Sequence, residues 1–356
     1  MNIKIELISE SDLADESFNI VIDGLKPRET YRVEMYLSDY YCINAPMLLT
    51  HDVLWRSTGT FVSDKNGIID ISQTPSCSGS YEDIATMGLF FNAKPLTNRK
   101  KKLPNSLSKI PLLDHFSVEI KIIQGNTVVA ERTFTRHYMS SQISHQDIYG
   151  KHFQGRLFYD KKAIKAPALI IVSGSEGRIE KAQNIAQLLS SRGYICLAVA
   201  YFGLEGLPKH LERIPLECLV EAKDYLRQHP RLDSEKIGLY GRSKGAELVL
   251  AEESIFNDVQ CLVLNSPSDV VYEGIIGKWN SHTSSWTNLK KELPYQKFRL
   301  GDYLFSKLLK KSFPKDCSAR IDIGQMYSPI LLKPSLLMAW IPPPTLTKIL
   351  SLHFGV

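Results

Sequence analysis

The stretch KIGLYGRSKGAELVL, residues 236–250, joins a short apolar run to a helical pattern through Gly-Arg-Ser-Lys-Gly. A serine between two glycines at a strand-to-helix turn is typical of a nucleophile elbow, which holds a hydroxyl above the edge of a sheet. A turn of small residues needed only for close packing would also explain Gly241 and Gly245, but it gives no reason for Ser243. We therefore expect Ser243 to be a catalytic nucleophile.

The segments around this turn alternate between apolar strands and helical patterns. Strands are expected at Pro167–Ser173, Gly193–Phe202, Lys236–Tyr240 and Gln260–Pro267. Helices are expected from about Ile179 to Ser191, along an apolar stripe from Leu211 to Leu226, and from the turn to roughly Glu253. Near-continuous apolar strands are typical of a sheet covered on both faces. The order favours an open, mostly parallel α/β sheet with right-handed crossovers.

The residues before about position 140 follow a different pattern of short, alternating segments. They lie at Phe18–Gly24, Thr30–Asp39, His115–Asn126 and Thr127–Tyr138. Alternation with period two predicts antiparallel strands, and the Gln-Gly-Asn sequence at 124–126 predicts a hairpin. We interpret residues 1–138 as an all-β sandwich, the polar residues 139–152 as a linker, and residues 153–356 as the α/β domain.

The composition is that of an ordinary globular protein with two domains. Of 356 residues, 44% are hydrophobic and 23% are charged, and the net charge of +5 is too small to indicate a nucleic-acid partner. We interpret the basic run Asn98–Lys102 as a solvated loop. The uncharged stretch Pro334–Thr347 is broken by three prolines, so no stable membrane insertion is expected.

The six cysteines are scattered without a C-x-x-C pair, so we expect neither a metal site nor a redox motif, and no cofactor. The N-terminus has no apolar region after a basic start, as a signal peptide would. These observations favour a cytoplasmic protein. No sequence feature indicates an oligomeric state.

A serine nucleophile requires an oxyanion hole of backbone amides. The residue after the nucleophile supplies one of them, here Lys244, and the loop after an early strand supplies the other. The glycine-rich turn Ser173–Gly177, SGSEG, follows the first strong strand, so Ser175 and Glu176 are the expected donors. Such a turn at a helix start could instead bind phosphate, but neither G-x-G-x-x-G nor G-x-x-x-x-G-K-[ST] is present. The aromatic and apolar residues Tyr201, Phe202 and Leu204 are expected in the core, although they could also border an acyl pocket.

Four segments together resemble the acyl-CoA thioester hydrolase / bile acid-CoA:amino acid N-acyltransferase family. They are GSYEDIATMGLFFNAKP at 79–95, SGSEGR at 173–178, AYFGLEGLPKHLERIPLECLVEAKDYLRQHP at 200–230, and GLYGRSKGAE at 238–247. The resemblance covers residues 1 to about 275. It implies an immunoglobulin-like sandwich followed by an α/β-hydrolase domain.

The resemblance also implies a reaction. Ser243 would attack the carbonyl of an acyl-CoA thioester, and water would cleave the acyl-enzyme to a fatty acid. In this family the nucleophile is serine in the hydrolases and cysteine in the amino-acid acyltransferases, so Ser243 indicates hydrolysis. An amino-acid N-acyltransferase, another ester hydrolase and a non-catalytic acyl-binding protein are the alternatives.

The triad acid and base do not follow from the sequence. The family places its acid after a strand that resembles Ser328–Leu332, and its histidine in a later Gly-His turn, but here no Asp or Glu occurs after Asp322. We therefore expect a chain truncated or altered after about residue 330, with a hydrolase domain that lacks its usual C-terminal portion. His282 and His353 are the histidines downstream of Ser243, and Asp269 is a candidate acid after an earlier strand.

Overall fold

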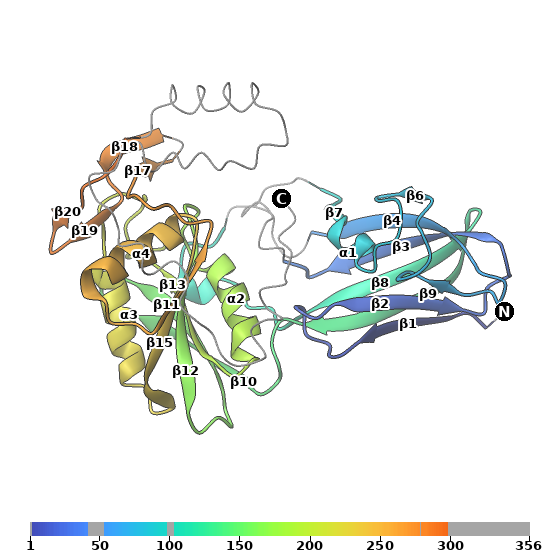
Figure 1. The fold of residues 1–356 in the computed structure, drawn as a ribbon, viewed down its shortest axis with the longest axis horizontal. Helices are drawn as coiled ribbons and strands as arrows, with labels where there is room; N and C mark the ends of the chain where they lie inside the picture. Colours follow the sequence, from blue (N-terminus) through green and yellow to red (C-terminus); the bar gives the residue numbers. More distant parts are fainter. Residues whose placement is uncertain (1, 42–52, 98–102, 278, 298–356) are drawn as a thin grey trace. The chain divides into compact units, whose positions relative to one another are not determined.

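The computed structural model describes residues 2–41, 53–97, 103–277 and 279–297. The chain divides into two compact units (Figure 1). The first contains the residues up to Ser144 with Tyr159–Lys162 and Asn184–Arg192, and the second contains His145–Phe158, Ala163–Gln183 and the described residues from Gly193 on. The boundaries 138 and 152 stay a prediction.

The first unit is built from two antiparallel sheets. One sheet has the order β1 (Lys4–Ser9), β2 (Phe18–Asp23), β5 (Ile69–Asp70). The other has the order β6 (Ser78–Gly79), β4 (Trp55–Val62), β3 (Thr30–Ser38), β8 (His115–Gln124), β9 (Thr127–His137), and β7 (Lys94–Pro95) pairs with β4. Two antiparallel sheets that share one hydrophobic core make up a β-sandwich.

Alternating side chains from both sheets form the core of this unit. Ile20 and Ile22 of β2 and Val118 and Ile120 of β8 are buried in one hydrophobic cluster. Two short helical segments, α1 (Gly88–Phe91) and a 3-10 turn (Leu107–Lys109), complete it. The hairpin between β8 and β9 is confirmed, with Gly125 at a φ of 60° in its two-residue turn.

The second unit contains a six-stranded, mostly parallel sheet, as the sequence predicts. Its order is β10 (Ile143–Tyr149), β11 (Gln154–Asp160), β13 (Ile195–Ala200), β12 (Ala166–Val172), β15 (Leu232–Arg242), β16 (Cys261–Asn265). The last four of these strands are parallel, and β11 runs antiparallel to β13. The carboxyl ends of the parallel strands therefore share one edge of the sheet.

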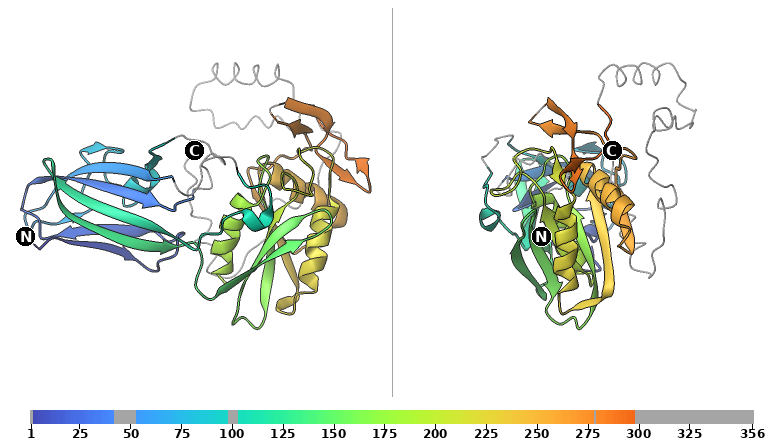
Figure 2. Two further views of the ribbon diagram at one scale, coloured as in Figure 1. Left: turned by 180° about the vertical axis from the view of Figure 1, so that it is seen from behind. Right: turned by 90° about the vertical axis from the view of Figure 1, so that its left-hand side faces the viewer.

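Three helices accompany the sheet, and two of them lie against its central and last strands. They are α2 (Glu180–Ser190), α3 (Glu217–Arg227) and α4 (Lys244–Phe256). Helix α3 contacts β12 and β15, and α4 contacts β15 and β16 (Figure 2). Two small sheets follow, β14 (Ile214–Pro215) with β19 (Trp286–Asn288) and β20 (Lys291–Glu292), and β17 (Glu273–Ile276) with β18 (Trp279–Ser284).

Two predicted elements differ from the structure. The helix expected along the stripe from Leu211 begins only at Glu217, because Ile214 precedes Pro215, which pushes it into extended backbone. Part of the expected linker forms the strand β10, which lies at an edge of the sheet. Edge strands tolerate outward-facing polar residues, so the composition of 143–149 concealed a strand.

Several expectations fall on residues outside the described ones. They are the basic run 98–102, the strand at 328–332, the expected change after about residue 330, and His353. Within the ranges given above, no helix is long and apolar enough to cross a membrane.

Candidate active site

Ser243 occupies the corner between β15 and α4, at the carboxyl edge of the parallel sheet. Its backbone has φ 54° and ψ −122°, a conformation that residues other than glycine adopt only at a cost in free energy. The residue is exposed, and no described residue bonds its Oγ. Its N–H donates to the Asn265 carbonyl at 2.8 Å, and its carbonyl accepts from the N–H groups of Ala246 and Glu247. This is the strained, exposed geometry of a nucleophile elbow.

The two glycines of the elbow are required by close backbone contacts. A Cβ on Gly241 would lie 2.3 Å from the Gly245 carbonyl oxygen, and one on Gly245 would lie 2.2 Å from the Ser173 carbonyl oxygen. Neither position has room for a methyl group. At Ser243, the backbone of α4 is therefore in direct contact with the backbones of β15 and of the loop that begins at Ser173.

The turn Gly174–Gly177 lies directly beside the elbow. A hydrogen bond from Gly177 N–H to Gly174 O, 3.1 Å long, closes it, and a Cβ on Gly174 would lie 3.0 Å from Ser243 Cβ. Ser175 is exposed and Glu176 is half-buried, and among the described residues their N–H groups have no acceptor. The same holds for Lys244 N–H, which begins α4 and so has no intrahelical carbonyl to bond. The predicted nucleophile and the predicted amide donors thus lie in adjacent segments.

The Lys244 side chain is largely covered, with 12% of its surface exposed. Its ammonium donates to Glu247 Oε1 at 2.9 Å and to Ser285 Oγ at 2.8 Å. Burial lowers the pKa of Lys244, and the neighbouring Glu247 acts in the opposite direction. Burial raises the pKa of Glu247, against the lowering influence of Lys244 and of bonds from Tyr272 N–H and the Trp286 indole. The pair is a compensated buried ion pair attached to the first turn of the helix.

Glu176 brings a carboxylate close to the nucleophile. Its Oε1 lies 3.6 Å from Arg242 Nη1 and 3.4 Å from Lys181 Nζ. Within the described part of the chain, this buried oxygen has no hydrogen bond. Its Oε2 lies 3.0 Å from the Cβ position of Gly174, the same point that is 3.0 Å from Ser243 Cβ. Two cations, Arg242 and Lys181, therefore lie beside this carboxylate.

The described residues do not bring a histidine into hydrogen-bond contact with Ser243. His282 lies on β18, its imidazole is 77% exposed, and its Nδ1 is 3.2 Å from Glu273 Oε2. Asp269 is exposed in the loop after β16. The candidate triad residues therefore stay predictions.

Three residues near the elbow were not identified as site residues from the sequence. Tyr201 was expected in the core and is fully buried there, but its hydroxyl also bonds the carbonyls of Ser173 and Gly174. Glu247 could have been suspected as a partner of Lys244 from the i,i+3 spacing. Nothing local to Trp286 indicates its bond to Glu247.

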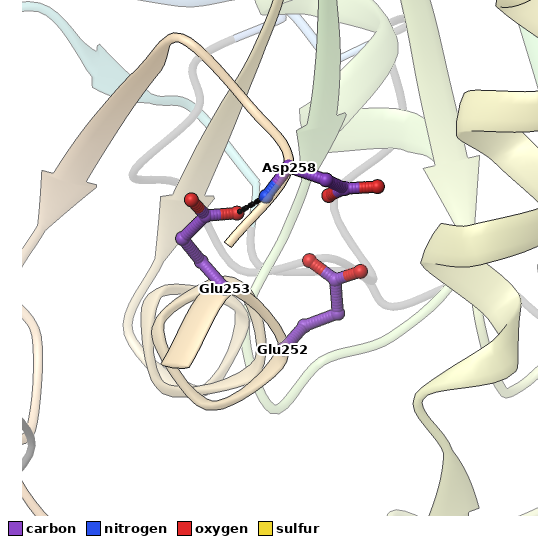
Figure 3. A group of neighbouring side chains, drawn as sticks. All are labelled: Glu252, Glu253 and Asp258. Atoms are coloured by element: carbon purple, nitrogen blue, oxygen red, sulfur yellow. Dashed lines mark hydrogen bonds between the residues drawn. The ribbon is translucent and has the colours of Figure 1, made fainter. Parts of the chain in front are cut away.

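A second carboxylate cluster lies at the other end of α4, formed by Glu252, Glu253 and Asp258 (Figure 3). One oxygen from each lies within 4.8 Å of the others, a spacing that a metal ion could use. The buried Lys223 ammonium bonds both Asp258 and Glu252, the latter at 2.5 Å, and Arg227 bonds Asp258 at 2.8 Å. Because Lys223 and Arg227 already pair with Glu252 and Asp258, we assign the cluster a structural role.

The sequence of the chain is similar to known proteins in both of its halves. The family model "Acyl-CoA thioester hydrolase/BAAT N-terminal region" matches residues 15–149, and "BAAT / Acyl-CoA thioester hydrolase C terminal" matches residues 214–333. Acyl-coenzyme A thioesterase 1 of Mus musculus is 26% identical over 299 residues, which cover 81% of this chain and 66% of that protein. Acyl-coenzyme A amino acid N-acyltransferase 1 of Mus musculus is 28% identical over 256 residues, 70% of this chain and 58% of that one.

The chain spans less than two thirds of the length of these relatives. Among solved structures, the α/β hydrolase GrgF from Penicillium sp. aligns with 37% of this chain and 47% of its own, at 20% identity and a TM-score of 0.32. The fold assignment comes instead from the strand order and the elbow of the chain itself. Both halves of the family match in order, a β-sandwich region and then a hydrolase region. The chain belongs to the acyl-CoA thioester hydrolase / bile acid-CoA:amino acid N-acyltransferase family.

Proposed function

We propose that the chain hydrolyses acyl-CoA thioesters with Ser243 as the nucleophile. The observation that carries this proposal is the strained, exposed backbone of Ser243 at the carboxyl edge of the sheet, with the turn 174–177 beside it. In open α/β sheets, ligands bind at this edge. The likeness to the mouse thioesterase supplies the substrate class.

The reaction would proceed in two steps. Ser243 Oγ bonds to the carbonyl carbon, the carbon–sulfur bond breaks, and CoA leaves as the thiol, having taken up the serine proton through a general base. Water then adds to the acyl-enzyme, the ester bond to Oγ breaks, and the fatty acid leaves. We assign the N–H groups of Lys244, Ser175 and Glu176 to the oxyanion that develops in both steps.

Thiol release from palmitoyl-CoA tests this proposal. We expect Ser243→Ala to lower the rate by at least about 10³-fold, because the acyl-enzyme cannot form. Ser254→Ala is the control, since the hydroxyl of this exposed serine of the same helix bonds, among the described residues, only the Ala251 carbonyl. Equal rates for the wild type and Ser243→Ala would contradict the proposal.

The related transfer reaction is supported by the likeness to the mouse N-acyltransferase. Adding glycine or taurine to the same assay separates the two reactions. A transferase would divert the acyl group into the amide, whereas a hydrolase yields free acid at an unchanged rate. Activity on simple esters but not on thioesters would indicate another ester hydrolase.

A non-catalytic acyl-binding protein is favoured by one observation. In the part of the chain that the structure describes, no histidine bonds Ser243, and a serine hydroxyl without a base is a poor nucleophile. Such a protein would bind palmitoyl-CoA in a calorimeter and release thiol no faster than Ser243→Ala. The cytoplasmic location and the lack of a nucleic-acid partner stay predictions from the sequence.

A further inference from the structure

The two segments that carry the proposed oxyanion amides meet at one backbone atom, the carbonyl oxygen of Ser173. Gly245, in the first turn of α4, approaches it so closely that a Cβ there would lie 2.2 Å away. On the other side, Ser173 leads directly into the turn 174–177. Any shift of this carbonyl therefore changes the distance between Lys244 N–H and the N–H groups of Ser175 and Glu176.

The Tyr201 hydroxyl holds this carbonyl in place. It lies 2.9 Å from Ser173 O and 3.0 Å from Gly174 O, and the side chain is fully buried. Gly174 O also accepts the Gly177 N–H that closes the turn. One hydroxyl proton is thus shared between two successive carbonyls at the base of the turn.

The Tyr201 ring is connected in turn to the elbow. It packs against the Trp286 ring, with centroids 6.0 Å apart and planes at 58°. Trp286 is fully buried, and its Nε1–H donates to Glu247 Oε1 at 2.9 Å. The same oxygen accepts from the ammonium of Lys244, the residue that follows the nucleophile. The chain of contacts begins at the elbow and ends at the turn.

We propose that Tyr201, Trp286 and Glu247 are positioning residues that set the spacing between the Lys244 amide and the amides of Ser175 and Glu176. The inference rests on the proposed function, because it assigns these amides to one oxyanion. None of the three side chains touches the substrate in this scheme. Amide donors act on a developing charge only when they are held within a few tenths of an ångström of their place, so the spacing affects the rate more than binding.

Packing alone would explain the two rings but not their polar atoms. Phenylalanine and leucine would fill the same space without a hydroxyl or an indole N–H that needs a buried partner. The test therefore uses substitutions that keep the packing: Tyr201→Phe removes the hydroxyl, and Glu247→Gln replaces the charged acceptor of the Lys244 and Trp286 bonds with a neutral one. Each has a matched control. Tyr31→Phe removes a buried hydroxyl that bonds Lys26 N–H in the first unit, and Glu253→Gln alters another buried carboxylate of α4.

The first measurement is steady-state hydrolysis of palmitoyl-CoA. We expect Tyr201→Phe and Glu247→Gln each to lower kcat by about tenfold or more, with KM changed by less than about twofold, because the misplaced amides stabilise only the transition state. The controls should keep the wild-type kcat. A wild-type kcat in both Tyr201→Phe and Glu247→Gln would overturn the inference.

The second measurement is amide hydrogen exchange of the peptides that span residues 170–180, which requires no substrate. Tyr201→Phe should speed exchange there, and so should Glu247→Gln, although that side chain does not contact the turn in any hydrogen bond. Wild-type exchange in both variants would overturn the inference. A wild type that releases no thiol counts against the proposed function alone, because the exchange result still decides whether this chain of contacts positions the turn.

Discussion

A lysine–glutamate pair lies at each end of helix α4, but the two pairs are built differently. At the first turn, Glu247 Oε1 accepts from Lys244 Nζ, Tyr272 N–H and the Trp286 indole. Near the last turn, Glu252 pairs with Lys223, and its second oxygen is buried without a partner among the residues that the structure describes. One carboxylate gathers donors from three segments of the chain, whereas the other mainly compensates a single ammonium.

The residues that flank the helix show the same difference. Ser243 before it and Asn257 after it both have positive φ, 54° and 49°. Asn257, with ψ 49°, lies in the ordinary left-handed region that asparagine tolerates, while Ser243, with ψ −122°, lies outside it. The comparison shows that one end of α4 is stable local structure, and that the other end is strained and braced by distant residues.

The largest expected effect concerns the two lysines. Lys223→Met should lower the free energy of unfolding by about 3–5 kcal/mol, because it leaves the buried Glu252 and its neighbour Asp258 short of a cation. Lys244→Met should cost less, about 1–3 kcal/mol, because Glu247 keeps two N–H donors. Urea denaturation measures both. Equal losses in the two variants would remove the distinction between the two ends. The control is Lys236→Met, an exposed position where the free energy of unfolding should change by less than about 0.5 kcal/mol.

A second prediction concerns pH and the far end of the helix. Burial raises the pKa of Glu252 from 4.5 to about 7, against the lowering influence of Lys223. The fold therefore favours the protonated acid, so this contribution to stability is complete below about pH 4.5 and is lost as the pH rises through about 7. Relative to the wild type, Glu252→Gln should gain up to about 3 kcal/mol in free energy of unfolding between pH 5 and pH 8.

The measurement is urea denaturation of both proteins at pH 5, 6.5 and 8. Because the other titrating groups are the same in the two proteins, their contributions cancel in the difference. A difference that does not change with pH would show that Glu252 does not titrate in this range.

The smallest expected effect concerns the strain at Ser243. The free energy of unfolding of Ser243→Gly should exceed that of Ser243→Ala by about 1–3 kcal/mol, because glycine adopts this backbone conformation without strain. Asn257→Gly compared with the wild type should gain less than about 1 kcal/mol, since asparagine is already suited to its φ and ψ. Thermal unfolding at one pH compares all four proteins. A gain at Asn257 as large as the one at Ser243 would argue against strain at the elbow.

The elbow itself could be predicted from the sequence because its signals are local. A strand, two glycines, a serine and a helical pattern occupy 15 consecutive residues, 236–250, and the structure confirms their arrangement. The turn 174–177 could be located for the same reason, and the role of its amides stays a prediction. Alternation with period two likewise predicted the antiparallel sandwich of the first unit.

The contacts that support the elbow could not be predicted in this way. Glu247 and Trp286 are 39 residues apart, and Tyr201 reaches back 27 residues to Gly174. A glutamate in a helix and a tryptophan in a polar segment have no local pattern that indicates their meeting. The prediction was wrong about the start of α3, because Pro215 interrupts the apolar helical pattern. It was also wrong about residues 143–149, because an edge strand can have the polar composition of a linker.

The backbone contact between Gly245 and Ser173 has a consequence for how such a protein can diverge. The joint contains no side chain on its helical side, so there is nothing in it to exchange. Residues on either side of the joint can therefore be replaced while the helix and the turn keep their separation. Substitutions around this corner can accumulate one at a time, because none of them has to be matched by a second change within the joint.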